Sequence, residues 1–321
     1  MIPAKDKLTI CFAHAAYRLD EQFRMRDSGI ASFEVRDPAT LAARIGEADV
    51  LVISGLWQNR LLERATRLSY IQSIGAGTDQ FPRDELARRG IRLASARGVN
   101  YRAVSEHAIA LILALARRLP EARDNQTKRQ WRGMIGNLAG REDELGGKTL
   151  LVVGLGQIGG RVAELARAFG MHVVGLRRDA ASGGPADEVR PMSDLKTVLP
   201  EADYVALCCP LTPETENLID GAALALMKPT AYLVNVARGR VVDEAALVEA
   251  LAGRRIAGAG LDVTVEEPLA ATSPLWGMAQ VLITPHTAGE TRRYEDNVLE
   301  ILEDNLARLW RGETELRNQI V

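Results

Sequence analysis

Cysteine is scarce in this sequence, and its three copies form no recognisable metal-binding or disulfide pattern. Cys11, Cys208 and Cys209 each lie within or at the end of an apolar run. Their spacing matches no zinc site, and adjacent cysteines rarely form a disulfide with each other. We therefore expect buried, reduced thiols, no metal site, and the cytoplasm as the compartment.

The sequence also lacks long apolar runs and an excess of charge of either sign. No apolar run reaches the ~18 residues that a membrane-spanning helix needs. The first residues, MIPAKDKLTICFAHA, contain too short an apolar segment and no clear cleavage site for a secretory signal. Lysine and arginine number 40 against 42 aspartates and glutamates. This balance gives no reason to expect a nucleic acid or an acidic membrane as partner.

What the sequence does contain is a regular alternation of short β-like and helix-like segments. A chain of 321 residues suggests two domains. The first series of strand-like segments lies at 8–13, 50–54, 70–75 and 91–95. The second series lies at 149–154, 172–176, 204–209, 231–236, 256–263 and 281–284. Such alternation is typical of parallel sheets covered by helices.

The order of these segments predicts a discontinuous first domain. A helical stretch at 105–119 separates the two series, and an amphipathic helix is expected at 291–312, after the second sheet. That last helix would pack most economically on the first domain. The fold class expected is α/β, with two doubly wound parallel-sheet domains, one inserted in the other. The boundaries expected are 1–98 with 288–321 for the first domain and 99–287 for the second.

A glycine motif follows the first strand of the second series. Residues 154–159 read GLGQIG, directly after TLLVV and before the helix-like GRVAELARAFG. In a dinucleotide-binding turn, the glycines permit the tight turn, close approach of the pyrophosphate and close helix–strand packing. The free N–H groups of the following helix would face the phosphates. The residues expected to bind a dinucleotide here are Gly154, Gly156, Gln157, Ile158 and Gly159.

The next strand ends in VVGLRRD, where two arginines stand in place of an acidic residue. A carboxylate about 20 residues after the glycine motif usually binds the ribose of NAD. It would repel a 2′-phosphate, whereas a guanidinium offers a fork of donors and a fixed positive charge. We therefore expect Arg177 and Arg178 to bind NADP(H), with NAD(H) as the second candidate. The alternative is that both arginines are solvated charges and the cofactor is NAD(H).

Three further segments place polar residues after strands of the second series, where doubly wound folds bind their ligands. They read NVARGRVVDE from 235, GLDVTVEEP from 260 and TPHTAG from 284. With SIGAGTD (73–79) and VSEHAIAL (104–111), they make most of the chain resemble the D-isomer-specific 2-hydroxyacid dehydrogenases. That family includes glyoxylate/hydroxypyruvate reductases, D-lactate dehydrogenases and phosphoglycerate dehydrogenases. The resemblance implies a Rossmann cofactor domain inserted in a flavodoxin-like substrate domain.

The resemblance also implies a role for individual residues. Arg238 matches the substrate-binding arginine, His286 the proton donor, and Glu267 the acid that orients the histidine. Ala76 and Gly77 match a loop whose backbone amides bind the substrate carboxylate. Asp262 matches the residue that contacts the nicotinamide carboxamide. The other cofactor contacts implied are Cys209, Pro210, Val236, Ala237 and Gly289.

These residue types suit the reduction of a 2-keto acid, which adds a hydride to the carbonyl carbon and a proton to its oxygen. His286 as imidazolium would supply the proton near neutral pH, and Glu267 would fix its tautomer and favour its charged form. Arg238 would clamp the carboxylate and polarise the keto oxygen. We expect an NADPH-preferring reductase of small 2-keto acids, glyoxylate or hydroxypyruvate first, and by resemblance a homodimer.

Two other functions stay open. One is an NAD-dependent D-2-hydroxyacid dehydrogenase for a bulkier substrate. The other is a non-catalytic protein that senses a dinucleotide, against which the joint presence of Arg238, Glu267 and His286 argues. Outside the motifs, we expect packing roles for His107, Trp57 and Trp310, and an oligomer contact or a pocket edge at 129–150.

Overall fold

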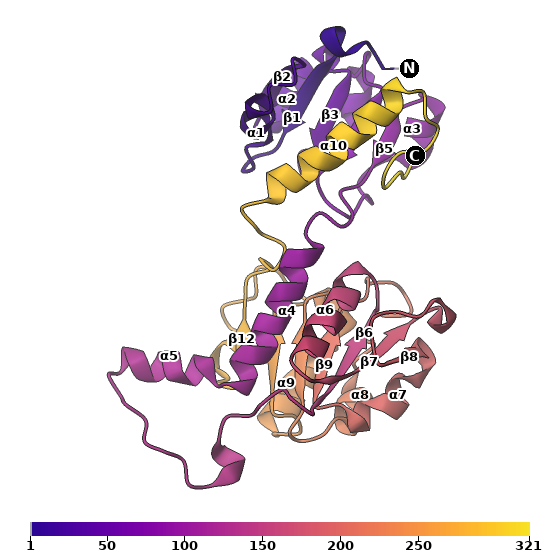
Figure 1. Cartoon of the computed structure of the whole chain (residues 1–321). Coiled ribbons are helices and arrows are strands. Elements are labelled where there is room, and N and C mark those ends of the chain that lie inside the picture. Colours follow the sequence, from indigo (N-terminus) through magenta and orange to yellow (C-terminus); the bar gives the residue numbers. More distant parts are fainter. Residues whose placement is uncertain (1) are drawn as a thin grey trace. The chain divides into compact units, whose positions relative to one another are not determined.

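The computed structural model describes residues 2–321, which form two compact units (Figure 1). The first unit runs up to Asn100 and resumes with Thr291–Val321, and the second comprises Tyr101–Glu290. Each unit contains one parallel sheet with helices on both faces. The α/β class with two doubly wound sheets, expected from the sequence, is confirmed.

The first unit contains a five-stranded sheet in the order β2-β1-β3-β4-β5, with all pairs parallel. The strands are β1 Thr9–Ala13, β2 Ala31–Val35, β3 Val50–Ile53, β4 Tyr70–Ser73 and β5 Arg92–Ala94. This is the flavodoxin-like order, in which the chain changes direction across the sheet between β1 and β3. β1 and β3 are buried and largely apolar, because helices cover both of their faces.

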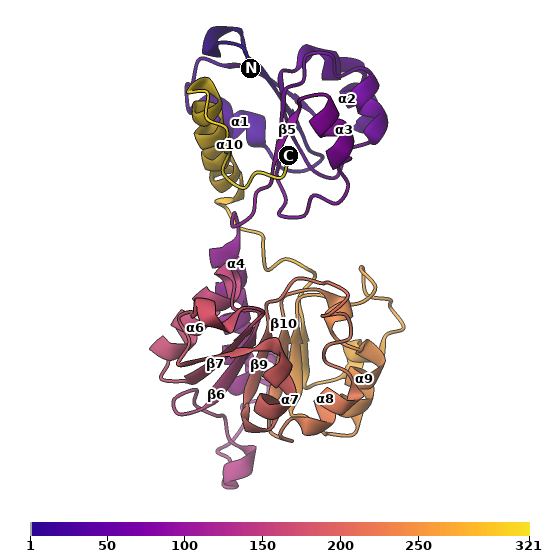
Figure 2. The ribbon, with the colours of Figure 1, turned by 90° about the vertical axis from the view of Figure 1, so that its right-hand side faces the viewer.

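Helices cover the two faces of this sheet in two layers (Figure 2). One layer consists of α1 (Leu19–Met25) and α10 (Tyr294–Trp310), which pack on the sheet through Phe23 and Leu302 among others. The other layer consists of α2 (Pro38–Arg44), a 3₁₀ helix at Asn59–Glu63, and α3 (Arg83–Arg88). Because α10 belongs to this unit, the last helix of the chain completes the core that the first strands begin.

The second unit contains a seven-stranded sheet in the order β12-β11-β10-β9-β6-β7-β8, again with all pairs parallel. The strands are β6 Thr149–Val153, β7 His172–Arg177, β8 Glu188–Pro191, β9 Tyr204–Leu207, β10 Tyr232–Asn235, β11 Gly258–Leu261 and β12 Val281–Ile283. This is the Rossmann order with one added strand, and its direction reverses between β6 and β9. Ligands of such sheets bind beyond the carboxyl ends of the strands at that reversal.

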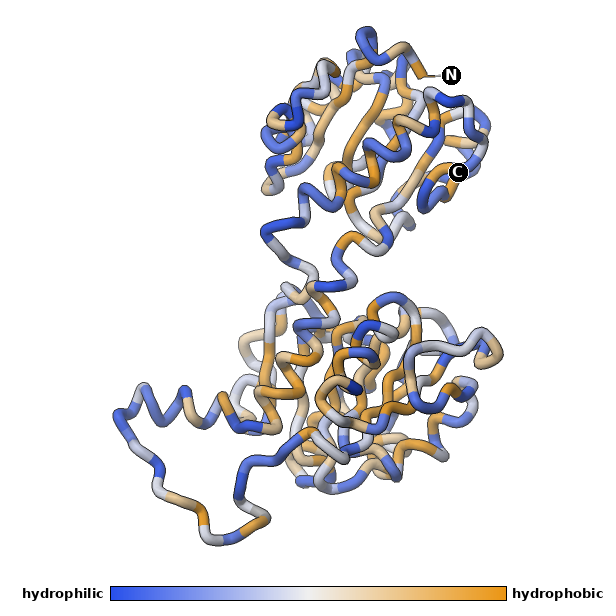
Figure 3. Tube along the Cα trace, in the orientation of Figure 1, coloured by the Kyte–Doolittle hydropathy of each residue, from blue (hydrophilic) through white to orange (hydrophobic). Residues whose placement is uncertain are grey.

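Two layers of helices cover this second sheet (Figure 2). α4 (Tyr101–Ala116) and α6 (Gln157–Ala168) lie on one face. The other face is covered by α7 (Leu195–Val198), α8 (Gly221–Leu226) and α9 (Glu244–Ala252). In both units the apolar residues concentrate along the strands and the inner sides of the helices (Figure 3).

An arm projects from the second unit between α4 and β6 (Figure 1). We define it as α5 (Leu119–Thr127) and residues 128–148, which include a 3₁₀ helix at Leu138–Gly140. α5 has no buried residue, and the side chains of Trp131 and Met134 are fully exposed. Within the arm, α5 and the segment around Trp131 and Met134 thus contribute nothing to the core of the unit, whereas Leu145, close to β6, is buried in it.

Several elements differ from the sequence prediction. β2 and β8 lie at sheet edges and carry polar or charged residues in place of an apolar run, so the pattern did not predict them. Residues 59–68 carry apolar residues at helical spacing but form only a short 3₁₀ helix at Asn59–Glu63. The helix expected at 105–119 begins earlier and ends at Ala116, because Arg118 adopts a left-handed conformation with φ of 50°. The C-terminal helix is shorter at both ends than expected.

The three cysteines are free thiols. Burial raises the pKa of Cys11 and Cys208 to about 12 and that of Cys209 to about 11. Within residues 2–321, no group of three or more His, Cys, Asp and Glu side chains is arranged to hold a metal ion. Over the same residues, no helix is both long and apolar enough to cross a membrane.

Candidate active site

The turn after β6 depends on positions that only glycine can occupy. Gly154 has φ of 96°, and a Cβ there would lie 2.6 Å from the backbone of Cys209. A Cβ on Gly159 would collide with the carbonyl oxygen of Gly154. The glycines therefore allow β6, the start of α6 and the loop after β9 to approach one another more closely than any other residue would permit.

The start of α6 is suited to binding an anion. The helix begins at Gln157 with Gly156 as its N-cap, and no side chain caps the first turn. Its first N–H groups, those of Gln157 and Ile158 included, therefore have no partner in the helix, and the helix dipole favours negative charge at this end. The turn lies at the reversal of strand order, where the loop after β9 with Cys209 and Pro210 is adjacent. This arrangement fits the pyrophosphate of a dinucleotide.

The two arginines after β7 differ in their surroundings. Arg177 is the last residue of β7, and its Nη1 donates a 2.6 Å hydrogen bond to the carbonyl oxygen of Gly183. Arg178 is exposed and makes no hydrogen bond or ion pair with the residues that the structure describes. The pKa of Glu214 is lowered chiefly by a hydrogen bond from Thr212, and the charge of Arg178 adds to this effect. Arg177 thus holds its own loop, and Arg178 is available to a ligand.

The loop after β10 presents Arg238. The buried Asn235 holds this loop with both ends of its amide: Oδ1 accepts from the backbone N–H of Ala237, and Nδ2 donates to the carbonyl oxygen of Arg238, each at 3.0 Å. Gly239 packs against the backbone of Thr264 so closely that a Cβ would clash. The Arg238 side chain is exposed and donates one bond of 2.6 Å to the carbonyl oxygen of Ala237. Its guanidinium therefore projects from a fixed backbone.

Asp262, directly after β11, fixes the loop after β12. Its carboxylate, only 2% exposed, accepts hydrogen bonds from the backbone N–H groups of Thr287 at 3.0 Å and Ala288 at 3.1 Å. Its backbone carbonyl accepts from the N–H of His286 at 2.8 Å. His286 has φ of 55°, a costly conformation for a non-glycine residue that persists only where the surrounding structure imposes it. Asp262 supplies that restraint.

His286 and Glu267 form a hydrogen-bonded pair. Oε2 of Glu267 lies 2.7 Å from Nδ1 of His286, and the two side chains are 38% and 46% exposed. The other carboxylate oxygen of Glu267 accepts from the backbone N–H of Thr264 at 3.2 Å. An ionised carboxylate only accepts, so Nδ1 of the imidazole carries the hydrogen of this bond. The second ring nitrogen, Nε2, is therefore the one left to exchange a proton with a substrate.

The strand order brings these residues to one edge of one sheet. β10, β11 and β12 are neighbours, and Arg238, Glu267 and His286 lie in the loops that follow them. Glu267 and His286 are in contact, and Arg238 lies on the loop after the adjoining strand. The remaining residues expected at the cofactor, which also follow strands of this sheet, are Cys209, Pro210, Val236, Ala237 and Gly289.

Ala76 and Gly77, expected to bind the substrate carboxylate, lie in the other unit after β4. Both residues are exposed, and their N–H groups have no hydrogen-bond partner in the described chain. The loop is held at its base, because Ser73 Oγ donates to the carbonyl oxygen of Gly75 at 3.1 Å and Ala96 N donates to the same oxygen at 3.0 Å.

Sequence reasoning missed two residues that build the site, Asn235 and Thr284. Both are polar residues that end or directly follow an apolar strand, and this position in the sequence could have indicated them as site residues. His107 lies beside Thr284, with its Nε2 2.9 Å from Oγ1 of Thr284. Trp57 is a packing residue, as expected, buried against Phe81 with ring centroids 5.0 Å apart.

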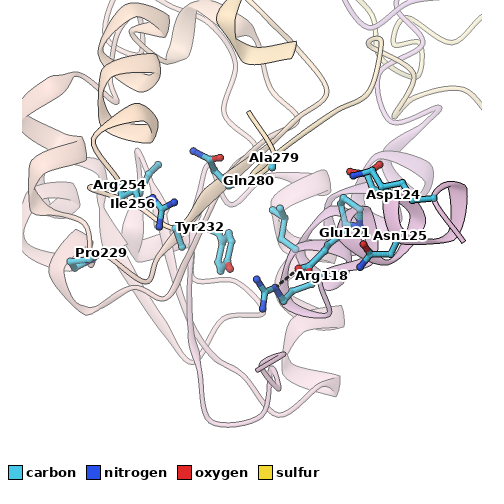
Figure 4. Close-up of a pocket in the computed structure, with 14 residues that line it drawn as sticks. Arg118, Glu121, Asp124, Asn125, Pro229, Tyr232, Arg254, Ile256, Ala279 and Gln280 are labelled. Atoms are coloured by element: carbon cyan, nitrogen blue, oxygen red, sulfur yellow. Dashed lines mark ion pairs between the residues drawn. The ribbon is translucent and has the colours of Figure 1, made fainter. Parts of the chain in front are cut away.

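A separate cavity lies at the amino ends of the strands of the seven-stranded sheet, whereas the candidate active site lies at their carboxyl ends (Figure 4). Its volume is about 590 Å³, with Tyr232 and Gln280 from the amino ends of β10 and β12 on one wall. α5 forms the other wall, where Arg118 and Glu121 make an ion pair of 3.0 Å. None of the expected site residues is among the described residues that line it. This cavity is therefore distinct from the candidate active site.

This chain is similar in sequence and fold to known proteins. Residues 109–288 match the family model of the D-isomer specific 2-hydroxyacid dehydrogenase, NAD binding domain. A D-3-phosphoglycerate dehydrogenase of Mycobacterium bovis is 37% identical over 262 residues, which cover 81% of this chain and 49% of that protein. A glyoxylate reductase of Pyrococcus furiosus is 36% identical over 284 residues, which cover 85% of this chain and 82% of that protein.

A solved structure from the same family resembles this chain over almost its whole length. The D-isomer specific 2-hydroxyacid dehydrogenase family protein from Aeromonas salmonicida is 30% identical and superposes with a TM-score of 0.85, covering 98% of this chain and 99% of that chain. By length, this chain spans about half of the curated phosphoglycerate dehydrogenases that it matches.

The fold and the site define a two-unit α/β protein with a dinucleotide-binding Rossmann sheet and a histidine–carboxylate pair at its carboxyl edge. The chain belongs to the D-isomer-specific 2-hydroxyacid dehydrogenase family. This confirms the family resemblance found in the sequence. The matched domain supports a nicotinamide dinucleotide as cofactor.

Proposed function

We propose that this chain reduces small 2-keto acids, with glyoxylate and hydroxypyruvate first, to 2-hydroxy acids, and that it prefers NADPH. The observation that carries the proposal is the 2.7 Å hydrogen bond between Glu267 and His286, at the sheet edge that also presents Arg238. The match to a glyoxylate reductase over most of its length supports a small substrate.

The turn after β6 fits the cofactor. A Cβ at Gly154 or Gly159 would clash with the backbone of Cys209 or Gly154, so the glycines permit the tight turn that leads into α6, where the uncapped N–H groups would hold the pyrophosphate. By resemblance, Asp262 and Gly289 would contact the nicotinamide end. When bound, the reduced nicotinamide supplies the hydride that is added to the carbonyl carbon.

His286 supplies the proton. In its imidazolium form it donates from Nε2 to the keto oxygen, while its Nδ1–H group stays bonded to Glu267. Because Glu267 holds the hydrogen on Nδ1, the neutral ring left after the transfer is the Nδ1–H tautomer. Arg238 binds the carboxylate of the substrate, because its unpaired N–H groups match two carboxylate oxygens. By resemblance, we assign the unpaired N–H groups of Ala76 and Gly77 to the substrate as well.

Steady-state turnover tests this proposal. Glyoxylate and hydroxypyruvate should be reduced with a higher kcat/KM than 2-keto acids with a bulky side chain. A preference for the bulky acids would favour the alternative dehydrogenase instead.

We assign the NADPH preference to Arg178 in the first place, because Arg177 is already bonded to Gly183. Arg178→Ser should raise the KM for NADPH at least ~10-fold and leave that for NADH within ~2-fold, since a hydrogen bond to a charged group contributes ~1.5–3 kcal/mol. Arg177→Ser is the matched control and should affect both cofactors alike, because it loosens the loop. An equal effect of Arg178→Ser on both cofactors would mean that Arg178 is a solvated charge.

The arm supports a homodimer. α5 contributes no residue to the core of its unit, and cavities of about 590 and 550 Å³ flank it. Tryptophan, methionine and arginine are enriched at protein interfaces, and the arm exposes Trp131, Met134 and Arg129. A nine-residue helix is marginal in water on its own. We propose that the arm packs against a second copy of this chain.

Hydrodynamics tests the dimer. The wild-type chain should sediment as a dimer, and the double substitution Trp131→Ser with Met134→Ser should shift it to a monomer, because the two side chains supply the apolar centre of the proposed contact. Trp276→Ser is the control, since Trp276 is also exposed but lies outside the arm. A monomeric wild-type chain, or a double variant that stays dimeric, would contradict this assignment.

A further inference from the structure

We propose that His107 is a positioning residue for this reaction, which holds Asp262 through Thr284 and thereby holds the loop that carries His286. The inference rests on the proposed function, because it concerns the placement of the proton donor. It is argued from the contacts that helix α4 makes with the loops after β11 and β12.

His107, Thr284 and Asp262 form a short chain of polar contacts. Nε2 of His107, on α4, lies 2.9 Å from Oγ1 of Thr284, the first residue after β12. That hydroxyl oxygen lies 2.6 Å from Oδ1 of Asp262. The distance from Nε2 of His107 to the same carboxylate oxygen is 3.6 Å, which is too long for a direct hydrogen bond. The link from the helix to the carboxylate therefore passes through Thr284.

The directions of these hydrogen bonds follow from the donor inventory. The Asp262 carboxylate only accepts, so the single hydrogen of the Thr284 hydroxyl is used in the bond to Asp262. The hydroxyl oxygen must then accept from His107, and Nε2 of His107 must carry a hydrogen. Both the neutral Nε2–H tautomer and the imidazolium meet this requirement. The role therefore needs an N–H donor at this place and does not need a charge.

The register of α4 on the sheet explains why His107 is at this place. A Cβ on Gly260 would lie 3.1 Å from Cβ of Leu111, so the glycine in β11 lets α4 pack closely there. Residues four apart lie on the same face of a helix, which puts His107 one turn before Leu111. That turn lies over the end of β11, where Asp262 follows. The contact is built into the packing of the helix.

Asp262 needs support because it is buried and holds several groups at once. Its carboxylate accepts the N–H groups of Thr287 and Ala288, and the Thr284 hydroxyl links it to His107. A buried carboxylate is stable only when its oxygens are bonded. Without His107, the Thr284 hydroxyl loses its donor and the oriented bond to Asp262 weakens. The left-handed backbone at His286 then loses part of its restraint.

The experiment compares His107→Leu with His107→Gln in the full-length protein. Leucine removes the donor, whereas the amide nitrogen of glutamine replaces Nε2–H. Thr284→Val removes the same link from its other end, so the test stands even if His107→Leu fails to fold. His172→Leu is the matched control, since His172 is exposed at the amino end of β7. Two quantities are measured: amide hydrogen exchange at Thr287 and Ala288, and kcat per cofactor-binding site.

For His107→Leu and Thr284→Val we expect amide exchange at Thr287 and Ala288 about tenfold faster. We expect kcat about tenfold lower, because a misplaced catalytic group costs rate. The cofactor Kd should change less than kcat, since the phosphates are assigned to the turn at Gly154–Gly159, which the substitutions do not touch. His107→Gln should restore both exchange and kcat, and His172→Leu should change neither.

Unchanged amide exchange in His107→Leu and Thr284→Val would overturn the proposal, and so would faster exchange with an unchanged kcat. Failure of His107→Gln to restore the wild-type values would also overturn it, because the role is that of a donor. If the wild-type protein reduces no 2-keto acid, the proposed function fails on its own. The exchange measurement still decides whether His107 holds the loop.

Discussion

His286→Ala should lower kcat for glyoxylate or hydroxypyruvate by at least ~100-fold, the lower end of what a positioned general acid contributes. The reason is that Nδ1 of His286 is bonded to Glu267, which leaves Nε2 as the nitrogen that gives its proton to the keto oxygen. The Kd for the cofactor should change little, because the phosphates are assigned to the turn after β6. Steady-state kinetics and a cofactor titration give the two values.

His172→Ala is the matched control for this result. His172 is a histidine of the same unit and is exposed at the amino end of β7, with Nε2 3.3 Å from Oε1 of Glu188. Its removal should leave kcat within ~2-fold, as is usual for an exposed residue away from the chemistry. Near-normal turnover in His286→Ala would show that the assigned proton donor is wrong.

Arg238→Gln should lower kcat/KM for the keto acid by about 30-fold or more. Removing one partner of a charged hydrogen-bonded pair costs ~2–5 kcal/mol, and each 1.4 kcal/mol corresponds to about tenfold. Most of the loss should fall on KM, because the guanidinium binds the carboxylate before the reaction as well as during it. Arg238→Lys should recover only part of the loss, since an ammonium lacks the planar fork that matches a carboxylate.

Arg240 provides the control for Arg238. It lies two residues further along the same loop, is exposed, and forms an ion pair with Glu216. Arg240→Gln should leave kcat/KM within ~2-fold, because exposed ion pairs contribute little. If Arg238→Gln and Arg240→Gln behave alike, Arg238 does not bind the substrate.

Much of the fold was predictable because buried parallel strands leave a clear pattern. β1, β3 and β6 are short apolar runs bounded by polar residues, and each was predicted within one residue of its observed bounds. The edge strands β2 and β8 were not, since a strand paired on one side needs no apolar run. The break between α4 and α5 was not predictable either, because it depends on the left-handed backbone of Arg118.

The candidate site also has parts that could be predicted from the sequence and parts that could not. The turn at Gly154–Gly159 follows from the motif itself, because steric limits dictate the glycines. The pairing of Glu267 with His286 was expected from the family resemblance and agrees with the observed contact. The link from His107 to Asp262 was not predictable, since it depends on the register of α4 over β11. No local pattern in the sequence encodes such a register.

The separate roles of Arg177 and Arg178 could not be read from the sequence for a related reason. The two arginines are adjacent at the end of the same predicted strand, so the sequence motif does not distinguish their roles. The loop that follows returns the carbonyl oxygen of Gly183 to Arg177, which leaves Arg178 exposed. The course of a short loop thus decides which cation a cofactor phosphate would meet.

The most direct test of the central claim is a spectrophotometric screen of a 2-keto acid panel with NADH and NADPH side by side. The panel should contain glyoxylate, hydroxypyruvate, pyruvate and a 2-keto acid with a bulky side chain. We expect turnover of glyoxylate or hydroxypyruvate with the highest kcat/KM, and a higher value with NADPH than with NADH. Tight binding of either dinucleotide without turnover of any acid in the panel would contradict it and would favour a dinucleotide-sensing protein.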